Sequence, residues 1–232
     1  AISQHASDFV DDALHRDDPF FLYLAFTAPH WPLHALADDI ERYRGTYRGG
    51  WDAMRTSRHE EQKGLGILDS KWAISARERG IPAWEDADNQ EWRDVQMATY
   101  AAQVEQLDRG IGQVLDTLQQ NGAMDDTIIM FMSDNGGCAE FLQEDTNYPD
   151  PSRYIHPTVD GRMVRVGNTP DIEPGPPDTF ASVDIAWANA SNAPFRLFKR
   201  YTHEGGISTP FIAHWPGRIP GGEIVHEPAH VM

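Results

Sequence analysis

Cysteine is nearly absent from this sequence, and so are long apolar runs and any excess of basic residues. Of the 232 residues only Cys138 carries a thiol, which excludes a disulfide within the chain. No apolar stretch approaches the ~20 residues that a membrane-spanning helix needs, so we expect no membrane partner. The 19 Lys and Arg residues face 36 Asp and Glu residues, and the formal net charge is −17. Such a charge argues against binding to nucleic acid or to an anionic membrane surface.

The hydrophobic patterns that are present predict an α/β fold. Residues 19–26 (PFFLYLAF) form a continuous apolar run, which is typical of a strand buried on both faces of a sheet. Residues 127–134 and 209–214 are predicted to be further buried strands. Between them, residues 96–120 carry apolar side chains at steps of three and four, which predicts a long helix packed on one face of the sheet.

The interval 139–194 is predicted to be a long, proline-rich loop region within the same domain. Eight of the 16 prolines lie between Pro149 and Pro194, where they interrupt any regular hydrophobic period. Loops of this length in a compact domain are commonly functional. The sequence also begins at Ala1, without an initiating methionine, and we expect it to be a piece cut at both ends from a longer chain.

Two short motifs could carry chemistry. In SDNGG (133–137), Asp134 and Asn135 follow a predicted strand and offer the hard oxygen ligands that Ca²⁺ or Mg²⁺ prefers. On the pair alone, a simple turn that caps the strand end is the favoured explanation. Lys199 lies five residues before an EGG turn and could donate hydrogen bonds to an anionic group, or could be an ordinary surface lysine.

Taken together, these motifs resemble the arylsulfatase family. The segments APHWPLHA (28–35), SDNGG (133–137) and K-x4-EGG, with the strand TPFIAHWPG ending at residue 217, occur in the order and at the spacing seen in that family. The resemblance implies an alkaline-phosphatase-like α/β fold, a mixed sheet with helices on both faces. It implies that residues 1–232 form a partial sulfatase catalytic domain.

The resemblance also implies a site and a reaction. Asp134 and Asn135 resemble ligands of a divalent metal, usually Ca²⁺, while His30 and Lys199 resemble the residues that contact the ester oxygen of a small-molecule sulfate ester. Hydrolysis builds negative charge on the leaving oxygen, and a cation or a proton donor there would stabilise that charge.

The family's nucleophile is missing from this sequence. Sulfatases use a formylglycine made from the first residue of a C/S-x-P-x-R motif, and no such motif occurs here: Cys138 is followed by Ala139, Glu140 and Phe141. We therefore expect the isolated chain to be an inactive piece of a sulfuric ester hydrolase. We also expect it to bind Ca²⁺ weakly and to self-associate through exposed sheet edges.

Three other functions remain open from the sequence. A phosphodiesterase or phosphonate monoester hydrolase of the same superfamily would use a similar metal and lysine, since phosphate and sulfate esters are nearly isosteric. The chain could also be a non-catalytic, truncated domain. Residues 226–230 match the zinc motif H-E-x-x-H, but Pro228 opposes the helix that would place His226 and His230 on one face.

Overall fold

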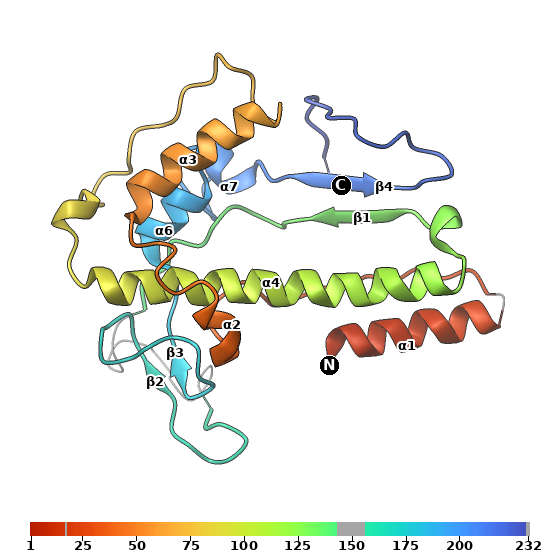
Figure 1. The fold of residues 1–232 in the computed structure, drawn as a ribbon, viewed down its shortest axis with the longest axis horizontal. Coiled ribbons are helices and arrows are strands. Elements are labelled where there is room, and N and C mark those ends of the chain that lie inside the picture. Colours follow the sequence, from red (N-terminus) through yellow and green to blue (C-terminus); the bar gives the residue numbers. More distant parts are fainter. Residues whose placement is uncertain (17, 143–155, 231–232) are drawn as a thin grey trace.

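The computed structural model describes the chain except for residues 17, 143–155 and 231–232. Figure 1 shows one long helix, α4, crossing the whole molecule, with the other elements arranged around it. The helices of four or more residues are α1 (Ile2–His15), α2 (Ala37–Glu41), α3 (Gly50–Gly64), α4 (Gln90–Gln120), α6 (Asp184–Ser191) and α7 (Glu204–Ile207). The strands are β1 (Ile129–Met132), β2 (Arg165–Val166), β3 (Thr179–Phe180) and β4 (Phe211–His214).

Helix α4 confirms the helix predicted at residues 96–120, and it begins six residues earlier. Asn89, with a positive φ of 58°, immediately precedes the first turn. Along the second half of α4, Val114 and Leu118 pack against Ala6 and Val10 of α1, which lies alongside (Figure 1). The two helices thereby form the apolar core of this end of the molecule.

The prediction of a strand at residues 19–26 is wrong. The segment has no regular secondary structure, and no backbone hydrogen bond joins it to any other described segment. Its side chains still alternate as they would in a strand: Phe20, Leu22 and Leu24 pack against the core between α1 and α4, whereas Phe21 and Tyr23 are 87% and 81% exposed. The apolar run therefore sets an extended backbone, but a strand also needs a neighbouring strand to bond with.

The other two predicted strands form, but they are not buried. β1 pairs with β4 in an antiparallel ladder in which Ile129 faces His214 and Met132 faces Phe211. Met130 and Ile212 are 55% and 56% exposed, so the expectation of burial on both faces is wrong. β2 and β3 make a separate, two-residue parallel pair. The described residues thus hold two small sheets with helices around them, a partial α/β arrangement in which one continuous mixed sheet is absent.

The interval 139–194 contains more regular structure than its prolines predict. Residues 143–155 lie outside the described part, but β2, β3 and α6 all fall within the rest. Helix α6 is buried along most of its length, and its Trp187 is fully buried, in edge-to-face contact with Trp51 of α3. This cluster forms a second core at the opposite end of α4 from α1 (Figure 1).

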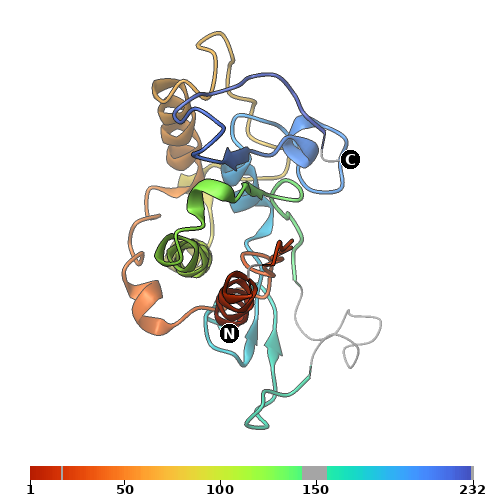
Figure 2. The same ribbon diagram turned by 90° about the vertical axis from the view of Figure 1, so that its right-hand side faces the viewer.

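The end-on view in Figure 2 shows how these parts sit around α4. The pair β1–β4 lies on one side of the helix, and α1 lies on another, below the strands. Across the described residues, no helix is both long and apolar enough to cross a bilayer.

Candidate active site

His30 and Lys199, which are 169 residues apart in sequence, are in direct contact. The Nζ atom of Lys199 lies 2.9 Å from Nε2 of His30, and Nδ1 of His30 lies 2.9 Å from the carbonyl oxygen of Trp31. A carbonyl can only accept, so the Trp31 carbonyl places the imidazole proton on Nδ1. The lone pair on Nε2 is then free to accept a hydrogen bond from the Lys199 ammonium.

Backbone hydrogen bonds hold Lys199 against the loop that follows β1. The Lys199 amide donates to the Gly137 carbonyl oxygen at 3.1 Å, and the Gly136 amide donates to the Gly206 carbonyl oxygen at 3.1 Å. The SDNGG loop is therefore bonded both to the segment that carries Lys199 and to α7, which begins with the EGG turn. Two motifs that the sequence places far apart meet in one place.

The glycines of these motifs are required because the backbones touch. A Cβ atom on Gly136 would lie 1.7 Å from the carbonyl oxygen of Gly205, and one on Gly205 would lie 2.2 Å from the carbonyl oxygens of Arg196 and Leu197. No side chain fits at such distances. The glycine pairs thus permit the close approach that brings Lys199 to the loop after β1.

Asp134 and Asn135 lie on this loop, directly after β1. The Ser133 hydroxyl donates to the backbone carbonyl of Asn135 at 2.9 Å, which fixes the turn, and the Asp134 side chain is exposed. Its carboxylate makes no hydrogen bond or ion pair with any other described residue. Among the described residues no hydrogen bond or ion pair joins either side chain to His30 or Lys199, and the two loops are held together through their backbones.

The donors on this loop suit part of a divalent metal site. A carboxylate and a carboxamide supply two hard oxygen atoms, whereas Ca²⁺ takes six to eight. Within the described ranges, no group of three or more His, Cys, Asp and Glu side chains could hold a metal ion. The two residues therefore fit a metal as a partial ligand set, and most of its coordination would have to come from elsewhere.

Two contacts beside this site were not predicted from the sequence. The indole Nε1 of Trp31 donates to Oε2 of Glu140 at 2.8 Å. The centroids of the Trp31 and His30 rings are 4.8 Å apart. The Asn192 side chain bonds to the SDNGG loop at Gly137. Neither Glu140 nor Asn192 belongs to a recognisable motif, and their partners are too far away in sequence for a spacing to reveal them.

Cys138 has the character of a structural thiol. It is half-buried, and burial raises the pKa of its sulfhydryl group above the usual value. A raised pKa keeps the sulfur protonated and poorly nucleophilic at neutral pH. This agrees with the sequence, in which Cys138 does not begin a C/S-x-P-x-R motif.

The zinc motif at 226–230 does not form the structure that it requires. These residues have no helical conformation, so His226 and His230 do not share a helix face. The interpretation of residues 226–230 as a helical zinc-binding motif is therefore wrong.

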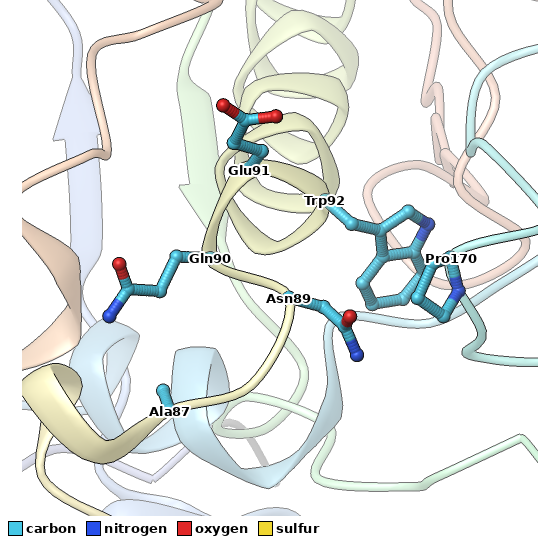
Figure 3. A pocket seen from close by; sticks show the side chains of 6 residues that line it. All are labelled: Ala87, Asn89, Gln90, Glu91, Trp92 and Pro170. Atoms are coloured by element: carbon cyan, nitrogen blue, oxygen red, sulfur yellow. The ribbon is translucent and has the colours of Figure 1, made fainter.

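A separate hollow lies at the beginning of α4 (Figure 3). It has a volume of about 540 Å³ and is lined by Ala87, Asn89, Gln90, Glu91, Trp92 and Pro170. In Figure 3 the Glu91 and Gln90 side chains point in different directions, and no set of charged groups converges on the hollow. It contains none of the four candidate site residues.

Comparison with known proteins identifies the family. The family model described as sulfatase matches residues 1–232. The chain is 34% identical over 98% of its length to an uncharacterized sulfatase of Schizosaccharomyces pombe, and 32% identical over 90% of its length to an arylsulfatase of Klebsiella aerogenes. It spans 40% and 43% of the lengths of these two relatives.

A solved structure shares the fold of this chain. The crystal structure of Ps i-CgsB matches 95% of the chain with a TM-score of 0.50 and 24% sequence identity, over 28% of that protein's length. The similarity in fold therefore covers nearly all of the chain and less than a third of the larger protein. On the match to the family model and on the two sequence relatives, the chain belongs to the sulfatase family.

Proposed function

We propose that the protein containing this chain hydrolyses small-molecule sulfate esters, and that His30 and Lys199 contact the ester oxygen that leaves. The observation that carries the proposal is the 2.9 Å contact between Lys199 Nζ and His30 Nε2, in a chain of the sulfatase family. Both groups meet beside the SDNGG loop, to which Lys199 is bonded through its backbone.

The chemistry of the pair suits this reaction. As the S–O bond breaks, negative charge grows on the leaving oxygen, and a fixed ammonium group stabilises that charge more than water does. The Trp31 carbonyl holds the His30 ring in one orientation, and the Lys199 ammonium points its proton at Nε2. An ester oxygen can reach both groups only if the two nitrogen atoms, 2.9 Å apart, separate to admit it. The Lys199 ammonium would then donate to the oxygen from one side, with the His30 imidazole on the other.

Asp134 and Asn135 would hold a divalent metal, with Ca²⁺ as the favoured ion. Bound there, such an ion neutralises charge on the sulfate oxygens and orients the nucleophile. The exposed Asp134 carboxylate, which has no protein partner among the described residues, supports this role. In the sulfatase family the nucleophile is a formylglycine, which would have to come from residues outside this sequence.

We also propose that the two small sheets belong to a larger, alkaline-phosphatase-like mixed sheet with helices on both faces. Side chains of the extended, unpaired segment 19–26 and Ile129 of β1 pack against the same core between α1 and α4, as side chains on one face of a sheet would. The chain covers less than half of the length of the two sequence relatives. Residues 1–232 would then form part of one catalytic domain, with 139–194 as its proline-rich connecting region.

The test uses the protein expressed from its complete reading frame and assayed with 4-nitrophenyl sulfate and with the phosphate diester bis(4-nitrophenyl) phosphate. We expect the sulfate to be the better substrate, and His30→Ala and Lys199→Ala each to lower kcat about 10²–10³-fold. Lys71→Ala is the matched control, since Lys71 is exposed and paired only with Asp69 on the surface. The 232-residue chain alone is expected to give no turnover and to bind Ca²⁺ weakly in calorimetry, because it lacks a nucleophile and most of the metal ligands.

Each arm of this experiment can contradict the proposal. Faster hydrolysis of the phosphate would favour a phosphodiesterase or phosphonate monoester hydrolase of the same superfamily. Full activity after loss of Lys199 or of His30 would exclude the residue that was replaced from the site. Turnover by the isolated chain that disappears in Lys199→Ala would reveal a nucleophile within these residues.

A further inference from the structure

We propose that Asn192 is a positioning residue, whose carboxamide joins three of the backbone segments of the site and thereby holds Lys199 where it meets His30. The Oδ1 atom of Asn192 accepts from the Gly137 amide at 2.8 Å. Its Nδ2 atom donates to the carbonyl oxygens of Leu197 and Gly205, both at 2.8 Å.

These three partners belong to three different parts of the site. Gly137 ends the SDNGG loop, Leu197 lies two residues before Lys199, and Gly205 is the first glycine of the EGG turn. One side chain therefore bonds to three segments of the site, and the fourth, which carries His30, is joined to them through Lys199. Only a carboxamide can do this, because the arrangement needs one acceptor and two donors on a single planar group.

Helix α6 holds Asn192 in place. Asn192 follows the last residue of the helix, where its amide donates to the Ala188 carbonyl at 3.0 Å and its carbonyl accepts from the Phe195 amide at 2.8 Å. The helix itself is anchored by the fully buried Trp187. The carboxamide is thus presented to the three loops from a rigid element.

The segment between Asn192 and Lys199 needs such a restraint. Leu197 and Arg200, on either side of the lysine, have φ angles of 64° and 76°, in the left-handed region that side chains other than glycine rarely adopt. The hydrogen bond from Asn192 to the Leu197 carbonyl fixes the first of these two residues. The path of the backbone through Leu197 sets the direction in which the Lys199 side chain leaves it.

The functional importance of this arrangement rests on the proposed role of Lys199, but the positioning itself can be measured without any turnover. Absence of sulfatase activity would therefore count against the proposed function and would leave the positioning result intact. The converse also holds, because a structural result on Asn192 does not depend on which ester is cleaved.

The experiment follows amide hydrogen exchange and the His30 ring ¹⁵N signals by NMR in the protein expressed from its complete reading frame. In Asn192→Ala we expect the Gly137 and Lys199 amides to exchange at least about tenfold faster, and the His30 Nε2 signal to move as its bond to Lys199 is lost. Asn192→Asp keeps an acceptor for Gly137 but cannot donate to Leu197. It should therefore leave the Gly137 amide protected and still alter Lys199 and His30.

Asn189→Ala is the matched control. Asn189 is a fully buried asparagine on the same helix, but its Oδ1 atom accepts from the Glu78 amide at 3.4 Å, away from the site. We expect this variant to lower the melting temperature and to leave the Gly137, Lys199 and His30 signals unchanged. Unchanged Lys199 and His30 signals in both Asn192 variants would overturn the proposal, as would equal changes in Asn189→Ala. If Asn192→Ala does not fold, the Asn192→Asp comparison alone decides between these outcomes.

Discussion

Gly136 shows, at the scale of single residues, how the site depends on the absence of a side chain. The carbonyl oxygen of Gly205 occupies the space where a Cβ atom of residue 136 would be, 1.7 Å from its ideal position. That oxygen belongs to the backbone and cannot move aside as a flexible side chain would. The two loops must therefore separate if the glycine is replaced.

Replacing Gly136 by alanine is expected to lower the free energy of unfolding by about 2 kcal/mol or more, because the added methyl group overpacks a backbone contact. Gly112 is the matched control: it lies within α4 with no atom near its missing Cβ, so Gly112→Ala should raise stability by about 0.5–1 kcal/mol. Urea titrations of the two variants measure both changes. Equal stability of Gly136→Ala and the parent chain would show that the loops are not held this closely in solution.

At the scale of elements, the packing of α2 on α4 depends on one buried carboxylate. Asp39 of α2 accepts hydrogen bonds from Arg42, from Gln106 and, at 3.2 Å, from Arg109. Burial raises the pKa of the Asp39 carboxyl, but these three hydrogen bonds together outweigh it and hold the pKa below its usual value of 3.8. The ionised form of Asp39 is therefore the form that the folded chain favours.

The stability that this carboxylate contributes should depend on pH. Because its pKa is lower in the folded chain than in the unfolded chain, the contribution is complete above pH 3.8 and is lost as the pH falls through the folded value. We expect Asp39→Asn to lower the unfolding free energy by about 1.5 kcal/mol at pH 7, and the difference from the parent chain to shrink below pH 3.8. Thermal melts of Asp39→Asn and the parent chain at pH 7 and pH 3 measure this difference in stability. Asp38→Asn, at the exposed neighbouring residue, is the control. A difference that stays constant with pH would contradict the assignment.

The elements also show which parts of this structure a sequence can predict. The apolar stripe of α4 is a local pattern, and the helix forms where the stripe predicts it. The run at 19–26 predicts an extended backbone correctly, but strand pairing depends on a neighbour that no local pattern reports. In the same way, the contact of His30 with Lys199 follows only from the resemblance to a family. Asn192 leaves no sequence signal, because its bonds to Gly137, Leu197 and Gly205 span 55, 5 and 13 residues and follow no regular spacing.

At the scale of the whole molecule, exposed apolar side chains are expected to cause self-association. Phe21 and Tyr23 project from the unpaired segment 19–26, and the outer faces of β1 and β4 are also apolar and exposed. The net charge of −17 opposes association, so we expect larger species to appear as salt screens that charge.

Sedimentation velocity over a range of protein and salt concentrations tests this expectation. The double variant Phe21→Ser, Tyr23→Ser should weaken association at least about tenfold, since two large apolar side chains would no longer be buried between copies. Val159→Ser removes an equally exposed apolar side chain from a different place and should have no effect. A parent chain that stays monomeric at high salt would show that the exposed faces do not pair.

The complete burial of Asn189 has a practical consequence for producing the protein. Asn189, Ala190 and Ser191 form an acceptor sequon for N-linked glycans, which are attached in the secretory pathway of eukaryotic cells. The Asn189 side chain has no exposed surface in α6, so the folded chain has no room for a sugar there. If Asn189 were glycosylated before α6 packs, Trp187 of that helix could not be buried against Trp51 of α3. Expression in the bacterial cytoplasm, where this modification does not occur, is therefore the route that leaves folding unobstructed.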